Sequence, residues 1–210
     1  AKKSRDRMHQ AILPLRGKPL NTFGLNLDKV LKNEECATLI NTIGCGVMDN
    51  CNPDNSHYGK IIIMTDADTD GAHIQTLLIT FFYNFMRPLI LKGMVFVAMP
   101  PLYRAAREIN KKIEYRYAWD ADGLEAAKKE LGGHPVVNRY KGLGEMNFDQ
   151  LRESTMAVKT RQLLKVTIED SVLAEQRLIT LMGNDPADRR AWIEENINFN
   201  EVDSFIEEVK

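Results

Sequence analysis

The 210 residues of this chain allow one large domain or two small ones, and 44% hydrophobic with 27% charged residues is typical of a globular protein. The net charge of −1 gives no overall bias towards nucleic acid. No apolar run approaches the ~20 residues of a membrane span, and the basic start lacks the apolar segment of a signal peptide. We therefore expect neither a membrane span nor a signal peptide.

The first eighteen residues carry six basic side chains against one acidic residue, Asp6, a local balance of +5. Gly17 lies between Arg16 and Lys18, so that backbone amides can approach a ligand while the two side chains supply positive charge. Such a turn suits contact with phosphate groups. A basic surface turn without a ligand fits this segment equally well.

The following residues alternate between helical and extended patterns. In the first half we expect an amphipathic helix in 27–40 with a second helix starting near Glu34, strands at 61–64 and 95–99, and a buried helix over 72–85 between these strands. A hairpin with basic arms is expected after 104, followed by a helix at 122–131. The rest of the chain has a helical bias from 148, a short strand at 166–168, a helix at 171–182 and a last helix from 189. In the hairpin region Tyr115, Tyr117 and Trp119 favour packing over base stacking.

Three carboxylates follow the apolar run Ile61–Met64, which is typical of a strand buried on both faces. Asp66, Asp68 and Asp70 occupy alternate positions, and Gly71 lets the chain turn into a helix. In open α/β folds ligands bind at the carboxyl ends of strands. Close carboxylates repel one another unless a cation neutralises them, and oxygen ligands without His or Cys indicate Mg²⁺ before Zn²⁺.

Several kinds of protein place acidic residues in this way. A solvated Asp-rich turn is the simplest interpretation. An EF-hand loop needs a Glu at its twelfth position, which is Leu77 here, and a haloacid-dehalogenase-type phosphotransferase needs Thr or Val where Asp70 stands. The metal site of the TOPRIM domain of topoisomerases matches the string Thr-Asp-Ala-Asp-Thr-Asp-Gly without a gap.

The three cysteines are an odd number. Cys45, Cys51 and His57 have a spacing that faintly resembles a metal site, but no paired C-x-x-C motif supports zinc. Unpaired cytosolic thiols are the favoured interpretation.

Motifs spread over nearly the whole chain resemble the C-terminal half of the B-type subunits of bacterial type IIA topoisomerases. The matching pieces are Arg5-Asp6-Arg7, Ala11–Lys18, Leu31–Glu35, Thr42–Gly44, Ile61–Ile74, Pro100–Tyr103, Arg139–Met146, Leu181–Gly183 and Arg189-Arg190. The resemblance implies an α/β fold: a TOPRIM core, which is a Rossmann-like parallel sheet flanked by helices, followed by a mostly helical tail. The expected division is a core at 1–104, an insertion at 105–133, a tail domain at 134–198 and a linker or tail at 199–210.

Two departures from the family pattern stand out. The family's TOPRIM domain opens with a strand ending in Glu-Gly-Asp-Ser-Ala, whose Glu completes the metal site, and this sequence starts just after it. We therefore expect a core without its first strand and without that Glu. Gyrase subunits usually have Asp-Val-Asp in the acidic motif and Gln before Pro-Pro-Leu-Tyr, whereas Thr69 and Met99-Pro100 stand here, which favours topoisomerase IV over gyrase.

The resemblance also implies roles for individual residues. The catalytic residues would be Asp66 and Asp68, which bind two Mg²⁺ per site in the full enzyme, with Mn²⁺ able to substitute. Asp70 would assist through water or by orienting its neighbours. The residues expected to contact DNA are Lys18, Asn21, His73 and Arg16.

The implied reaction is Mg-dependent cleavage and religation of double-stranded DNA, coupled to ATP in the full enzyme. The nucleophile would be a Tyr of an A-type subunit in an A2B2 heterotetramer, a bacterial cytoplasmic, nucleoid-associated enzyme that quinolones trap during cleavage. This chain alone is expected to be inactive. The alternatives are a DNA-binding or scaffolding module without activity and a haloacid-dehalogenase-type phosphotransferase.

Overall fold

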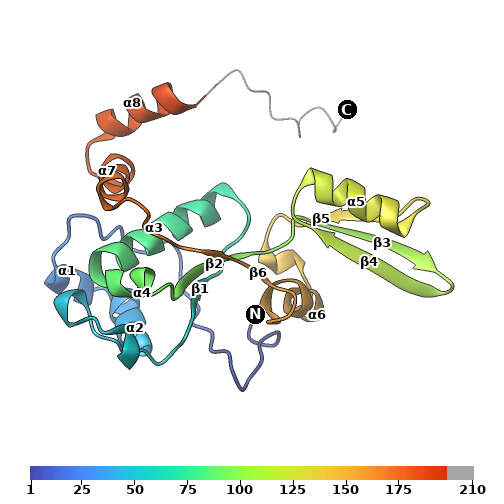
Figure 1. The fold of residues 1–210 in the computed structure, drawn as a ribbon, viewed down its shortest axis with the longest axis horizontal. Helices are drawn as coiled ribbons and strands as arrows, with labels where there is room; N and C mark the ends of the chain where they lie inside the picture. The colour runs from blue at the N-terminus through green and yellow to red at the C-terminus, as the bar shows by residue number, and fades with distance from the viewer. Residues whose placement is uncertain (198–210) are drawn as a thin grey trace.

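The computed structural model describes residues 1–197 and is a mixed α/β fold with two separate sheets (Figure 1). In the first sheet, β1 (Ile61–Ile63) pairs in parallel with β2 (Val95–Met99), and β6 (Gln162–Lys165) pairs antiparallel with β2. The strand order is β1-β2-β6. A strand from the C-terminal region therefore completes this sheet. Its strand β1 leads into the segment that carries Asp66, Asp68 and Asp70, which we call the acidic loop.

The main core lies between the first sheet and its helices. Its largest fully buried side chains include Phe81 and Phe82 on α3 (Thr69–Phe85) and Leu89 on α4 (Arg87–Leu91). Asn26 and Asn33 cap the helices that precede the sheet, α1 (Leu27–Leu31) and α2 (Glu34–Ile43), each accepting a backbone N–H. Two 3₁₀ helices, η1 (Met48–Asn50) and η2 (Pro53–Asn55), lead from α2 to β1.

The second sheet is fully antiparallel and has the order β4-β3-β5. It consists of β3 (Tyr103–Ile109), β4 (Lys112–Ala118) and β5 (Val136–Arg139), and α5 (Ala121–Leu131) packs its buried Ala127 and Leu131 against Ala105. Asn110 and Lys111 both have positive φ, 53° and 63°, so the hairpin turns with the handedness that suits twisted strands.

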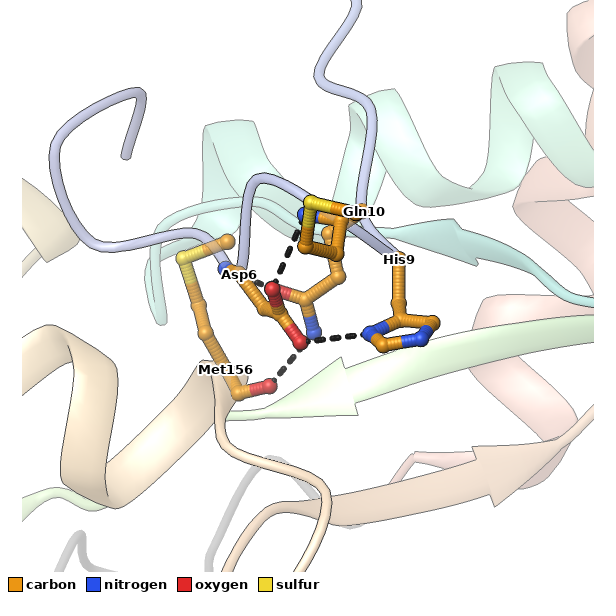
Figure 2. A network of polar contacts seen from close by, with 5 residues as sticks. Asp6, His9, Gln10 and Met156 are labelled. Carbon is orange, nitrogen blue, oxygen red and sulfur yellow. Dashed lines mark hydrogen bonds and ion pairs between the residues drawn. The ribbon is translucent and has the colours of Figure 1, made fainter.

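A chain of short helices crosses between the two sheets. They are η3 (Leu143–Glu145), α6 (Phe148–Leu151), which Asn147 and Gln150 cap reciprocally, and the π-helix η4 (Arg152–Met156). The N-terminal segment lies against η4, as Figure 2 shows: the Gln10 side chain donates to the Met156 carbonyl at 2.7 Å, and Asp6 accepts from His9 at 2.8 Å. The basic start of the chain is thus attached to the C-terminal region.

Two helices end the described part, α7 (Ser171–Met182) and α8 (Pro186–Asn196), with Asp170 and Asp185 as their N-caps. They stand beyond α3, on the opposite side of the molecule from the hairpin of β3 and β4 (Figure 1). Among residues 1–197, no helix is long and apolar enough to cross a membrane.

The elements expected from the sequence are largely present, with two corrections. Ile61 and Ile62 are half-buried, so the expectation of burial on both faces is wrong, because β1 lies at the edge of the sheet formed by the described residues. The strand expected at 166–168 lies earlier, at Gln162–Lys165, because those residues pair with β2. The expected linker at 199–210 lies outside the described residues.

Phe82, which is 1% exposed, tests the main core. Phe82→Ala should lower the free energy of unfolding by about 3–5 kcal/mol, because the core cannot fully close the cavity. Phe148→Ala is the matched control, because Phe148 is 54% exposed and its loss should cost under about 1 kcal/mol. Equal losses in urea unfolding would show that Phe82 is not a core residue.

Candidate functional site

Asp66 lies in the loop between β1 and α3, at the carboxyl end of the strand. The loop folds back tightly, because a Cβ at Gly71 would lie 2.0 Å from the carbonyl oxygen of Asp66. The side chain of Gln75, in the second turn of α3, donates to Thr65 Oγ1 at 2.7 Å and holds the start of the loop. Asp66 itself is exposed at this turn.

The Asp66 carboxylate contacts a distant loop. Its Oδ1 accepts a hydrogen bond from the backbone N–H of Leu143 at 2.7 Å, across 77 residues of sequence. A Cβ on Gly142 would lie 3.0 Å from Asp66 Cγ and Oδ1. The Gly-Leu backbone therefore packs directly on the carboxylate.

Asp68 and Asp70 have other partners. Asp68 is the N-cap of α3 and accepts from the N–H of Gly71 at 2.7 Å. Asp70, in the first turn of α3, forms an ion pair with Lys18 at 2.8 Å, and the hydrogen bond from Lys18 lowers the pKa of the Asp70 carboxyl. The ion pair joins the acidic loop to the basic turn of Arg16, Gly17 and Lys18.

The three carboxylates do not converge on one point. Within the described part of the chain, no group of three or more His, Cys, Asp or Glu side chains is arranged to hold a metal ion. The donor chemistry nevertheless fits a hard cation, since Asp66 and Asp68 are exposed carboxylates that follow the carboxyl end of β1. Asp66 and Asp68 are the residues that fit this role, whereas Asp70 is engaged with Lys18.

The residues expected to contact DNA gather at one place, with one exception. Lys18, Asn21 and His73 line a pocket of about 560 Å³ between the N-terminal turn, α3 and the start of α8. The Asn21 side chain donates to the Met182 carbonyl at 3.0 Å, which ties the turn to α7. Arg16 is not among the lining residues, although it is exposed in the same turn, where its N–H donates to Glu35 at 2.6 Å.

Sequence reasoning missed two contributions to this region. Arg189 lines the same pocket and donates to the Gly183 carbonyl at 2.8 Å. The contact of Gly142 and Leu143 with Asp66 was also not foreseen. Glycines at 142 and 144 indicate that the backbone there can pack closely against another group. The sequence does not indicate which distant side chain that group is.

The aromatic side chains of the hairpin are engaged with the chain itself. The hydroxyls of Tyr115 and Tyr117 both donate to the Glu153 carboxylate, at 2.8 and 2.7 Å, and Arg104 lies over the Tyr115 ring at 4.5 Å. The bond to Glu153 raises the pKa of Tyr115, and burial followed by that bond raises the pKa of Tyr117. These contacts agree with the packing role expected from the sequence.

The three cysteines are buried free thiols. Cys45 and Cys51 lie with their sulfurs 3.5 Å apart, and burial raises the pKa of the Cys51 thiol to about 12. Because the thiolate is the reactive form, the raised pKa disfavours reaction of the Cys51 thiol near neutral pH.

The ion pair between Lys18 and Asp70 can be tested by titration. Since the folded pKa of Asp70 is lowered from 3.8, its stabilising effect is present above that value and is lost as pH falls through the folded pKa. We expect an Asp70 midpoint below 3.8 by carbon NMR, and Lys18→Ala should raise it towards 3.8. Arg16→Ala serves as the control and should leave the Asp70 midpoint unchanged. An Asp70 midpoint that is the same with and without Lys18→Ala would disprove the ion pair.

Comparison with known proteins identifies the family. A family model described as the Toprim domain matches residues 1–100, and one described as the carboxyl terminus of the DNA gyrase B subunit matches residues 132–194. The B-type subunit of DNA topoisomerase 4 from Streptococcus pneumoniae is 55% identical over 95% of this chain and 31% of its own length. The corresponding subunits of Staphylococcus epidermidis and Staphylococcus aureus are 52% and 51% identical, each over 95% of this chain and 30% of their own length.

The chain thus spans about a third of the length of these relatives. They are topoisomerase IV subunits, in agreement with the preference that Thr69 and Met99-Pro100 indicated. The two family models follow one another along the chain in the order that the resemblance implied. The chain therefore belongs to the B-type subunits of bacterial type IIA topoisomerases.

Proposed function

We propose that this chain supplies the metal-binding and DNA-contacting half of a DNA cleavage and religation centre. The observation that carries the proposal is the ion pair of 2.8 Å between Lys18 and Asp70. It places the basic turn directly beside the acidic loop in a chain of the topoisomerase family. A centre that cuts a DNA backbone needs both functions at one point, because the reacting phosphate must be held and its charge neutralised.

In this proposal Asp66 and Asp68 hold Mg²⁺, with two ions per site in the full enzyme and Mn²⁺ as a possible substitute. A metal ion held there would supply charge neutralisation at the DNA phosphate and at the departing 3′ oxygen. The chain's own contribution is to fix the carboxylates. Asp68 is held by the N–H of Gly71 and Asp66 by the N–H of Leu143, so neither carboxylate has to be ordered when DNA arrives.

The basic turn and the pocket beside it would hold the DNA backbone. Lys18 is 54% exposed and its partner Asp70 71% exposed, and a surface pair of this kind contributes little to stability. Lys18 can therefore exchange the Asp70 carboxylate for a DNA phosphate at low cost. Asn21, His73 and Arg16 lie in or beside the same region and would add further contacts to the backbone.

The nucleophile would come from an A-type subunit in an A2B2 heterotetramer. Tyr115 and Tyr117 of this chain are unsuited to attack, because both hydroxyls donate hydrogen bonds to Glu153 and the raised pKa values keep both tyrosines protonated. A Tyr of the partner would attack the phosphate and stay joined to the 5′ end, and the released 3′ oxygen would later reverse the step. We therefore expect this chain alone to be inactive in cleavage.

The remaining features of the proposal concern the whole enzyme. It would pass one duplex through another with ATP, act on the nucleoid in the bacterial cytoplasm, and be trapped during cleavage by quinolones.

The test uses the full-length B-type subunit that contains this chain, mixed with its A-type subunit, Mg²⁺ and supercoiled plasmid. Asp66→Asn should reduce protein-linked linear DNA at least about 100-fold, because one ionised group of the centre is lost. Asp49→Asn, at an exposed carboxylate in η1, should cleave as the parent does. Cleavage by Asp66→Asn near the parental rate would mean that the metal site lies elsewhere.

A further inference from the structure

The contact between Asp66 and the loop of residues 140–146 has two components. The N–H of Leu143 donates to Asp66 Oδ1 at 2.7 Å, and Gly142 leaves the space in which a Cβ would lie 3.0 Å from the carboxylate. The backbone at Gly142 is extended, with φ of −159°, which any residue can adopt. Glycine at this position is therefore explained by the approach of Asp66 and not by the conformation of the turn.

The loop is anchored at its start and closed by a hydrogen bond between two of its own residues. The N–H of Tyr140 donates to the Leu102 carbonyl at 2.8 Å, and the Glu145 side chain accepts from the N–H of Lys141 at 2.9 Å. A small core of Tyr140, Met146, Leu151 and Met156 lies beneath the loop, and Leu143 packs against it.

The same small core also receives Met64, two residues before Asp66. The acidic loop and the loop of residues 140–146, which we call the glycine loop, are therefore packed on one cluster of side chains. Because both sides of the hydrogen bond share this support, the N–H of Leu143 is directed at the carboxylate before any ligand binds.

We propose that Gly142 and Leu143 are positioning residues for cation binding: the N–H of Leu143 donates to Asp66 Oδ1 and fixes the carboxylate that would bind the metal. The inference rests on the proposed role of Asp66. It adds that the C-terminal region, far from the acidic motif in sequence, sets the orientation of a ligand in the Toprim domain. Loss of a group that orients a metal ligand commonly weakens metal binding about 10- to 100-fold.

The test compares two glycines of the same loop. A Cβ on Gly142 meets the Asp66 carboxylate, whereas a Cβ on Gly144 has open space around it. The probe is Mn²⁺ added to the 210-residue chain, with free Mn²⁺ measured by electron paramagnetic resonance. Gly142→Ala should weaken Mn²⁺ binding about 10- to 100-fold, and Gly144→Ala should change it less than about twofold.

A double-mutant cycle with Asp66→Ala separates positioning from a general effect of the substitution. Once the carboxylate is removed, Gly142→Ala should change neither Mn²⁺ affinity nor the metal-free melting temperature. Equal Mn²⁺ affinities of Gly142→Ala and Gly144→Ala would overturn the inference, as would an effect of Gly142→Ala that persists without Asp66. If Asp66→Ala itself leaves Mn²⁺ binding unchanged, the proposed metal role of Asp66 fails instead.

Discussion

One hydrogen bond, from the N–H of Leu143 to Asp66, joins the C-terminal region of this chain to the loop that carries the candidate site. It joins the end of the parallel strand β1 to the helices that cross between the sheets, over 77 residues of sequence. An N–H bond to an ionised carboxylate is among the stronger hydrogen bonds in proteins. Without it, Asp66 would be an exposed side chain free to rotate, whereas Asp68 would still be held by the N–H of Gly71.

The rest of the fold keeps the donor and the acceptor of this hydrogen bond close together. Strand β6 pairs with β2 and brings the C-terminal region onto the first sheet, while Glu153 binds two tyrosines of the hairpin and brings the same region onto the second. Gln10 attaches the N-terminal segment to Met156. Because η4 is involved in two of these attachments, the glycine loop can move little relative to the acidic loop. Lys18, which the N-terminal turn carries, adds an exposed ion pair with Asp70 that contributes little to stability.

Local patterns predicted what depends on local physics. The apolar run before Asp66 and the buried helix that carries Phe81 and Phe82 follow from hydrophobic spacing. Resemblance to a family, and not periodicity, gave the roles of Asp66, Asp68 and Lys18. What the sequence could not give are partners separated by long stretches of chain: Leu143 for Asp66, β6 for β2 and Arg189 for the pocket. Such pairings depend on the complete fold, since a glycine pair is compatible with many neighbours.

The most direct test of this account is hydrogen exchange at the amide of Leu143 in the metal-free chain. The account predicts that this amide is protected in the parent and that Asp66→Ala removes the protection, because the acceptor is gone. The amide of Tyr140, which donates to Leu102, should stay protected in both proteins and show that the loop is still anchored. A Leu143 amide that exchanges at the rate of an unstructured peptide in the parent, or that is equally protected in both proteins, would contradict the claim that Asp66 is held by this loop.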